Sequence, residues 1–303
     1  MPNKQLIQRL KKLVGRKNVL TRKSSTAYYR TGWRYGFGGA TAVVFPNSLF
    51  HYWQVLETAV EGNCIVIMQG AKTGLTGGSC PNGFEYDREV LIVNTSRLKG
   101  IALLEGGKQV LAFPGTTLFE LTQKLKSIGR VPHSVLGSTN IGATVIGGIA
   151  NNAGGALCKR GCSYTELSLF ARVNESKQLE LINHLGIRNL GSSPREIFAS
   201  LENESFSQSD LQDFDKPASD RDYENRIRNL DAKTPNRFNA DPARLFDVSG
   251  SAGKVAAFAV RVDTYPAPKK TQVFMLGTND PEHFATFRKS VLKNFIEQKK
   301  IAI

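Results

Sequence analysis

The first apolar residues of the chain recur at the spacing of a helix. They fall on one face of an amphipathic helix that we expect to pack against the rest of the protein. Residues 1–40 also carry ten Lys or Arg and no acidic residue. Organellar transit peptides share this composition, so a targeting segment is the competing interpretation and a folded helix is the favoured one. The residues of the apolar face are Leu6, Ile7, Leu10, Leu13 and Val14.

The next hundred residues alternate between strand-length apolar runs and helical periodicity. Residues 42–45, 64–68 and 90–93 are short apolar runs, and residues 49–60 place apolar side chains at helical spacing after Ser48, which can cap a helix. This pattern predicts a β-α-β unit. The glycine-rich loop "GAKTGLTGGS" follows the second run, at the strand end where open α/β units bind ligands.

The second half of the chain has a different pattern. A helix is predicted at 117–127, capped by Thr116, and a second glycine cluster, "LGSTNIGATVIGGIANNAGG", occupies 136–155. The acidic stretch 202–225 is interpreted as a surface insertion or a partly disordered loop. The predicted fold class is therefore α+β, with two lobes that each contribute a glycine-rich segment. Further strands are expected at 109–115, 163–173, 178–183, 255–264 and 272–277, and a last helix at 281–297.

The composition adds a large basic excess. The 303 residues include 40 Lys or Arg and 26 Asp or Glu, which gives a formal charge of +14, and 41% are hydrophobic, enough for a substantial core. The charge favours anionic partners such as nucleotides, nucleic acids, anionic lipids or small carboxylates. Because no nucleic-acid recognition motif accompanies it, a nucleic-acid partner is disfavoured. No apolar run is long enough to span a membrane.

Cysteine and histidine are too scattered to indicate a metal site. Cys64, Cys80, Cys158 and Cys162 form no Cys-x-x-Cys pair, and no histidine lies at zinc-finger spacing. We therefore expect reduced, packing cysteines in a protein made in the cytosol, and no metal. His133 is the one histidine near both glycine segments in sequence. A lone histidine is more often structural than a catalytic base.

Neither of the common phosphate-binding motifs accounts for the glycine loops. No segment matches the dinucleotide pattern G-x-G-x-x-G, and the Walker-like "VSGSAGKV" has Val248 and Val255 where glycine and Ser/Thr are required. Successive backbone N–H groups in a glycine-rich turn can still bind an anion without a helix. The loop at 70–79 therefore suits a pyrophosphate, with an ordinary surface loop as the alternative.

Longer strings give the chain a specific resemblance. "MQGAKTGLTGGS", "PGTTLFEL" and "PHSVLGSTNIGATVIGGIANNAGG" resemble the flavin-binding fold of the vanillyl-alcohol-oxidase (PCMH) type. Together with "YTELSLFARVN", "LINHLG", "FNADP" and "AGKVAAFAVRVDT", they resemble the quinone-dependent D-lactate dehydrogenases more closely. The resemblance runs from about residue 5 to about residue 295.

The resemblance implies a noncovalently bound FAD held between two subdomains. The first glycine loop corresponds to the family's pyrophosphate-binding positions, and the second cluster and the late strand correspond to flavin-contacting positions. Lys72 stands where relatives can carry an uncharged polar residue, so we expect its main-chain amide to matter more than its charge. The positions carried over are Gly70, Ala71, Lys72, Thr73, Gly74, Gly78, Ser79, Gly137, Thr144, Gly154 and Ala257.

The resemblance also implies a domain plan. A basic N-terminal helix and lead-in (1–35) precede the FAD-binding domain (36–265), whose subdomains are expected at about 36–95 and 96–265. Residues 266–303 are expected to begin a truncated substrate-cap and membrane-binding domain, because family members continue far beyond this point. The catalytic residues are expected mainly in that missing part.

The function implied is the oxidation of D-lactate to pyruvate, with electrons passed to a membrane quinone. The chain would be the FAD-binding part, and a separate C-terminal fragment could complete it. The full-length enzyme would act as a peripheral protein on an anionic membrane, at the inner face of the cell membrane. The alternatives are an FAD-binding remnant without catalysis and a flavin dehydrogenase for another 2-hydroxy acid.

Overall fold

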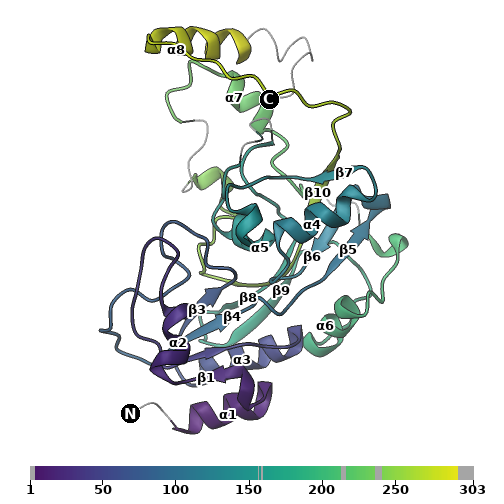
Figure 1. The fold of residues 1–303 in the computed structure, drawn as a ribbon. Helices are drawn as coiled ribbons and strands as arrows, with labels where there is room; N and C mark the ends of the chain where they lie inside the picture. Colours follow the sequence, from purple (N-terminus) through teal and green to yellow (C-terminus); the bar gives the residue numbers. More distant parts are fainter. Residues whose placement is uncertain (1–3, 156, 158–159, 213–215, 236–240, 293–303) are drawn as a thin grey trace.

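The computed structural model describes residues 4–155, 157, 160–212, 216–235 and 241–292. Two β-sheets form the body of the protein, and helices lie between and around them (Figure 1). The strands of the first sheet lie within 19–94, and those of the second within 101–266. Two sheets contributed by successive parts of the chain agree with the predicted α+β class.

The first sheet contains the predicted β-α-β unit. Its strands run in the order β1 (Val19–Leu20), β2 (Ala42–Val44), β4 (Val90–Asn94) and β3 (Ile65–Gln69). The β2–β4 and β3–β4 pairs are parallel, as expected when a helix, here α3 (Leu49–Glu61), connects two strands. The predicted cap is confirmed, because the N–H of His51 donates to Ser48 Oγ at 3.0 Å.

The second sheet is antiparallel and is built around one long strand. Strand β10 (Ala256–Pro266) lies between β6 (Gln109–Ala112) and β8 (Ser168–Val173), and β7 (Arg130–Pro132) pairs with its end. The outer strands are β5 (Ile101–Leu104) and β9 (Leu179–Asn183). The β10–β8 register shifts between Ala257 and Ala259, which marks a bulge.

The helices divide the apolar residues into separate cores. Helices α3 and α6 (Pro194–Glu202) pack on one side of the second sheet, and α4 (Leu118–Lys126) and α5 (Val145–Ala150) pack on the other (Figure 1). Helix α1 (Lys4–Val14) packs on α3 and on the edge of the first sheet. The first of these cores also contacts the first sheet, so α3 joins the two sheets. The remaining helices of the described residues are α2 (Lys23–Arg30), α7 (Tyr223–Arg228) and α8 (Pro281–Ser290), with 3-10 turns at Arg16–Asn18, Glu105–Gly107, Thr139–Ile141, Gln208–Asp210 and Pro242–Arg244.

The N-terminal residues form the folded helix that the apolar periodicity predicts. Leu6, Ile7, Leu10 and Val14 are buried in α1, and Leu13 is partly buried against the same core. The helix therefore contributes to the hydrophobic core together with α3, which confirms the folded-helix interpretation of this basic segment.

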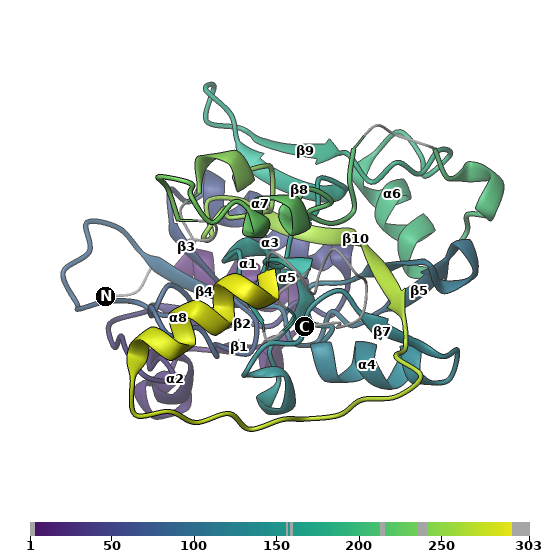
Figure 2. The same cartoon turned by 90° about the horizontal axis from the view of Figure 1, so that it is seen from above.

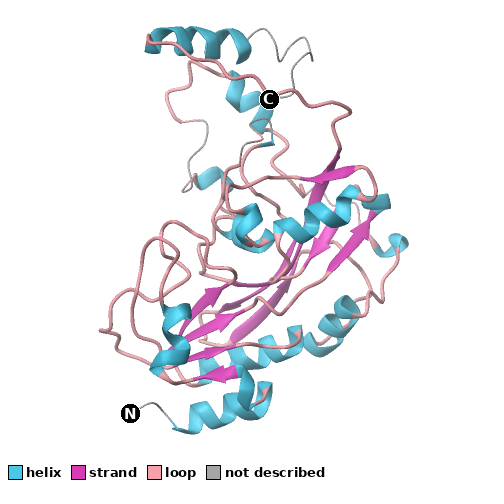
Figure 3. Ribbon diagram, in the orientation of Figure 1, coloured by secondary structure: helices cyan, strands magenta, loops and turns pink. Residues whose placement is uncertain are grey.

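The prediction of a strand at 272–277 is wrong. These residues form an exposed connection between β10 and α8 and pair with no strand in the described part of the chain (Figure 3). Apolar content favours a strand, but a strand also needs a neighbour to accept its backbone hydrogen bonds. The last helix ends at Ser290, and residues 293–297 of its predicted range lie outside the described residues.

Several boundaries differ from the prediction for local reasons. Thr117, rather than Thr116, caps α4, because the N–H of Glu120 donates to Thr117 Oγ1 at 3.1 Å. Strand β8 begins only at Ser168. The backbone just before it forms hydrogen bonds with other segments; for example, the N–H of Glu166 donates to the carbonyl of Pro217 at 2.9 Å. Part of the acidic stretch is not a surface loop, because Asp220 is buried.

Among the described residues, no helix combines the length and the apolar character needed to cross a bilayer.

Candidate functional site

The first glycine loop begins where β3 ends, and a buried glutamine fixes both of its ends. Gln69 Nε2 donates to the carbonyl of Ser79 at 2.6 Å and to that of Tyr29 at 2.9 Å. Gln69 Oε1 accepts from Asn94 Nδ2 at 3.0 Å, and the two residues pair in register on β3 and β4. This pair of polar side chains closes the loop 70–79 against the strand ends.

The side chain of Lys72 contacts the N-terminal segment at Tyr28 and Thr31. Its backbone φ is +48°, and its side chain is buried. The ammonium donates to the carbonyl of Thr31 at 3.0 Å and lies 3.6 Å from the centre of the Tyr28 ring. Burial lowers the pKa of this ammonium. Because the ammonium is engaged by the N-terminal segment, the part of Lys72 left for a ligand is its main chain.

Within the two glycine segments, three glycines are required neither by packing nor by backbone conformation. A Cβ placed on Gly74, Gly78 or Gly137 would meet no atom within 4 Å, and none of the three has a positive φ. Gly77 is different, since its φ is +74° and a Cβ there would lie 2.9 Å from the Tyr35 ring. Glycine at the three open positions is the pattern expected where backbone must approach a bulky ligand closely.

The second glycine segment lies directly against the first. Thr144 caps α5, with the N–H of Gly147 donating to its Oγ1 at 3.0 Å. A Cβ on Gly70 would lie 3.0 Å from that same Oγ1, and a Cβ on Gly142 would lie 3.6 Å from Cβ of Ala71. Residues some seventy positions apart therefore meet, and the open glycines belong to adjoining segments.

The other predicted site residues lie at and around this junction. Ala257 is buried on β10 opposite Phe170, in the core on the α4 and α5 side of the sheet. Gly154 is exposed and bridges to Cys162 after α5. Thr73 and Ser79 are half-buried in the first loop. The structure thus brings Gly70 against Thr144 and Ala71 beside Gly142, while Gly154 and Ala257 lie further along the second segment and its sheet.

His133 has an environment unsuited to a catalytic base. Its side chain is buried, and its Nδ1 finds no hydrogen-bond partner among the described residues. Burial lowers the pKa of His133 to about 4. Its neighbour Ser134 pairs with Ser163, with the two hydroxyl oxygens 2.9 Å apart. The imidazole is therefore neutral near pH 7 and enclosed by protein, which is a structural role.

Sequence reasoning missed a histidine-carboxylate pair beside the second sheet. His184 Nδ1 lies 2.6 Å from Asp247 Oδ2, and the imidazole meets the Phe170 ring edge to face at 6.1 Å. It also missed Gln69 and Asn94. A signal for these two was present, because each is a polar residue that ends a run of apolar strand residues.

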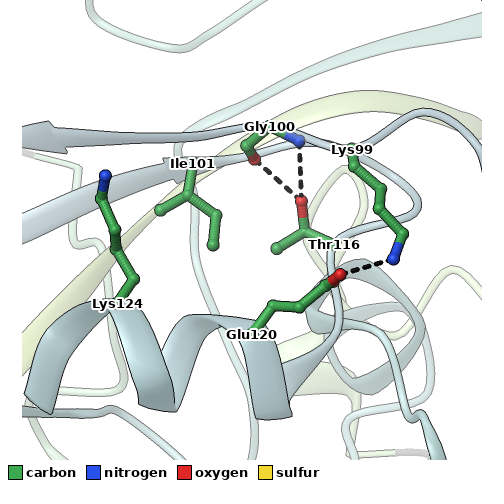
Figure 4. Close-up of a pocket in the computed structure, with 6 residues that line it drawn as sticks. All are labelled: Lys99, Gly100, Ile101, Thr116, Glu120 and Lys124. Atoms are coloured by element: carbon green, nitrogen blue, oxygen red, sulfur yellow. Dashed lines mark hydrogen bonds and ion pairs between the residues drawn. The ribbon is translucent and has the colours of Figure 1, made fainter.

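Two hollows on the described surface lie apart from the glycine segments. One is lined by Tyr86, Asp87, Arg88 and Glu89. The other hollow lies between α4 and the start of β5 (Figure 4). The ion pair between Lys99 and Glu120 lies at this hollow, and Thr116 Oγ1 donates to the carbonyl of Gly100 at 2.8 Å. Both are shallow and lack unexplained groups, so the adjoining glycine segments are the stronger candidate site. Among the described residues, no three His, Cys, Asp or Glu side chains gather as a metal site.

Comparison with known proteins identifies the domain type. Residues 40–169 match the family described as FAD binding domain. The chain is 52% identical over 293 residues to the quinone-dependent D-lactate dehydrogenase of Escherichia coli strain K12. The matched region covers 97% of this chain and 51% of that protein. It is 48% identical to the protein of that name from Haemophilus influenzae, over 97% of this chain and 52% of that protein.

A solved structure of p-cresol methylhydroxylase with substrate bound shares the fold, with a TM-score of 0.55 and 13% identity over 88% of this chain and 44% of that one. This likeness concerns the fold alone, and it confirms the predicted α+β, PCMH-type class. The chain spans about half the length of the curated relatives it matches. Over that half, the chain is a homologue of the quinone-dependent D-lactate dehydrogenases and carries an FAD-binding domain of the vanillyl-alcohol-oxidase type.

Proposed function

We propose that the chain holds FAD as the cofactor-binding part of an enzyme that oxidises D-lactate to pyruvate and passes the electrons to a quinone. The observation that carries the proposal is the group of open glycines, Gly74, Gly78 and Gly137, at which neither packing nor φ requires glycine. The high identity to D-lactate dehydrogenases supports the substrate. Because the chain spans about half of those relatives, the activity is proposed for the complete enzyme.

Each candidate residue has a role that follows from its environment. The backbone of Gly70–Gly74 would bind the pyrophosphate of FAD, with Gly78 and Ser79 closing the loop. Lys72 would contribute its main chain, because its ammonium is bonded to Thr31. The positions proposed to contact the flavin are Gly137, Thr144, Gly154 and Ala257. Bound FAD would supply the electron acceptor, while the protein supplies placement and electrostatics.

The proposal extends to the surroundings of the complete enzyme. Residues 266–303 would begin a substrate-cap and membrane-binding domain, and the groups that bind the carboxylate of lactate and take its hydroxyl proton would come mainly from it. A separate polypeptide could supply that domain. The formal charge of +14 would favour an anionic membrane surface, so we propose a peripheral location at the inner face of the cell membrane.

One experiment tests the proposal directly. The purified chain, supplied with FAD and freed of excess cofactor, should show the visible absorption bands of a bound flavin. D-lactate added without oxygen should leave those bands unchanged, because the substrate-binding groups are proposed to lie elsewhere. A preparation that cannot take up FAD would refute the proposal. Bleaching by D-lactate would instead mean that this chain already contains a complete reductive half-reaction.

The same measurement tests two alternative functions. A cofactor-binding module with no role in turnover predicts bound flavin that no 2-hydroxy acid reduces even when the rest of a relative is joined to the chain. A dehydrogenase for another substrate predicts that a different D-2-hydroxy acid bleaches the joined protein faster than D-lactate does.

A further inference from the structure

The N-terminal segment between α2 and β2 lies along the first glycine loop. We call residues 28–39 the strap; they comprise the end of α2 and most of its connection to β2. Gln69, just before the loop, donates to the carbonyl of Tyr29 at 2.9 Å. Just beyond the loop, the N–H of Gly83 donates to the carbonyl of Phe37 at 2.9 Å. In both views, α2 lies on the same side of the molecule as β3, which leads into the loop (Figure 1, Figure 2).

The strap is closed on itself by hydrogen bonds. The N–H of Gly32 donates to the carbonyl of Gly36 at 2.8 Å, and the buried Arg30 donates through Nη1 to the carbonyl of Gly38 at 2.7 Å. Thr31 lies between the two residues that make these bonds. Its carbonyl, which accepts from the ammonium of Lys72, is therefore held in a defined position.

The strap covers the loop from one side and leaves the other side open. A Cβ on Gly77 would lie 2.9 Å from both the ring and the carbonyl oxygen of Tyr35. A Cβ on Gly74 or Gly78 would meet no atom within 4 Å. Gly77 thus faces the strap, whereas the two open glycines present the side of the loop that is left for a ligand.

Lys72 is an unfavourable residue for its position unless its contacts with the strap matter. Its φ of +48° lies in the left-handed region, which asparagine and glycine adopt more readily than lysine. Its side chain is only 8% exposed, and lysine is rarely buried without a partner. The contacts set against these two costs are the hydrogen bond to Thr31 and the position of the ammonium over the Tyr28 ring.

We infer that Lys72 is a positioning residue for FAD, because its ammonium holds the strap against the loop and so keeps the loop amides arranged for the pyrophosphate. This inference rests on the proposed function. It extends the FAD site to residues 28–39, which precede the residues 40–169 that match the FAD-binding family. A chain whose strap is released is competent to bind only part of the time, and its apparent affinity falls by that fraction.

Lys72→Asn tests the inference, because asparagine keeps the main-chain amide, suits the positive φ and removes the ammonium. The FAD-free variant should keep a Tm within a few degrees of the wild type. Its Kd for FAD, from titration of flavin fluorescence, should be weaker by about tenfold or more, and amide hydrogen exchange in peptides covering 28–39 should be faster. Equal affinity in the two proteins, or weaker affinity with unchanged exchange of the strap, would overturn the inference.

Lys177→Asn is the matched control. Lys177 also has a positive φ, of +59°, but it is exposed in the turn between β8 and β9. The same substitution there removes the same charge and relieves the same kind of backbone strain. It should leave both the Kd for FAD and the exchange of the strap at wild-type values, and weakening equal to that of Lys72→Asn would assign the effect to net charge and overturn the inference.

A second variant separates the strap from direct attraction between the ammonium and FAD. Tyr28→Leu removes the ring under the ammonium, and it should fold because that ring is exposed. It should weaken FAD binding in the wild-type chain and add little in the Lys72→Asn background, since both changes break the same link. Additive effects on the Kd would mean that Lys72 acts on FAD without the strap, which overturns the inference.

Bound FAD gives a reciprocal measurement. Because coupling between two events acts in both directions, FAD should slow amide exchange of the strap in the wild-type chain, and unchanged exchange would overturn the inference. A wild-type chain that stays colourless after incubation with FAD would refute the proposed function and this inference with it. Yellow wild-type and Lys72→Asn chains of equal affinity would refute the role of Lys72 alone.

Discussion

Gly70 and Thr144 meet where the two glycine segments adjoin, and a Cβ on Gly70 would crowd the side chain of Thr144. A Cβ on Gly70 would lie 3.0 Å from Oγ1 and 3.2 Å from Cγ2 of Thr144. Gly70 follows β3 of the first sheet, whereas Thr144 caps a helix on the second sheet. Their contact therefore sets how closely the two halves of the candidate site approach each other.

Gly70→Ala should destabilise the protein because the side chain of Thr144 must shift to admit the new methyl group. Thr144→Ala removes both crowded atoms and should itself cost about 1 kcal/mol as a lost helix cap. In the Thr144→Ala background the cost of Gly70→Ala should largely disappear, with a coupling energy on the order of 1 kcal/mol. Urea unfolding of the two single variants and the double variant measures it.

Thr117→Ala is the matched control, since Thr117 caps α4 in the same way and does not crowd Gly70. Its cost should add to that of Gly70→Ala without coupling. Strict additivity for Gly70 and Thr144 as well would mean that the two segments are not held in contact.

Gly74→Val should abolish uptake of FAD while leaving the stability of the cofactor-free chain unchanged. A Cβ at this position would meet no atom of the protein within 4 Å, so unchanged stability of the cofactor-free variant would show that a loss of binding does not come from misfolding. Gly277→Val is the control, because Gly277 is equally open and has no positive φ. Flavin absorbance after gel filtration gives the readout. Undiminished flavin in the Gly74 variant would place the cofactor elsewhere.

The β-α-β unit and its loop were predictable because their signals are local. The apolar runs of β3 and β4 and the cap at Ser48 each depend on a few consecutive residues. Helix α5 was not predicted, because Val145, Ile146 and Ile149 are interspersed with glycines that disfavour a helix. Its formation depends on tertiary burial of those three side chains.

The contacts inside the candidate site required the structure for a different reason. The resemblance supplied residue positions, but it could not show that Gln69 holds both ends of the first loop or that Lys72 turns toward Thr31. These contacts join segments about ten and forty residues apart. The strand expected at 272–277 failed in the same way, since pairing depends on a partner that local sequence does not contain.

Because of His133, we expect the free energy of unfolding to decrease as the pH falls from about 6.5 to about 4. Burial depresses its pKa in the folded state to about 4, below the ordinary value of 6.5, so the unfolded chain binds a proton that the folded chain excludes. The stabilising contribution is complete above pH 6.5 and is lost as the pH falls through this window. It amounts to roughly 3 kcal/mol at most.

His133→Asn removes this titration and should flatten the curve of unfolding free energy against pH between 4 and 6.5, as measured by urea unfolding at several pH values. His283→Asn, at an exposed position, serves as the control for replacing a histidine outside the core. An unchanged slope in the His133 variant would mean that His133 is accessible to solvent protons in the folded protein.

Asp220→Asn should cost on the order of 2 kcal/mol, because it removes the carboxylate shared by two partly buried guanidinium groups. Asp220 Oδ2 accepts from Arg226 Nη2 at 2.5 Å and from Arg244 Nε at 2.7 Å, and its side chain is only 2% exposed. The carbonyl of Arg244 in turn accepts from Asn152 Nδ2 at 3.1 Å, beside the second glycine segment. Glu180→Gln breaks the more exposed pair with Arg172 and should cost less than about 1 kcal/mol. Urea unfolding at pH 7 compares the two, and equal losses would show that burial of Asp220 contributes nothing to the strength of its ion pairs.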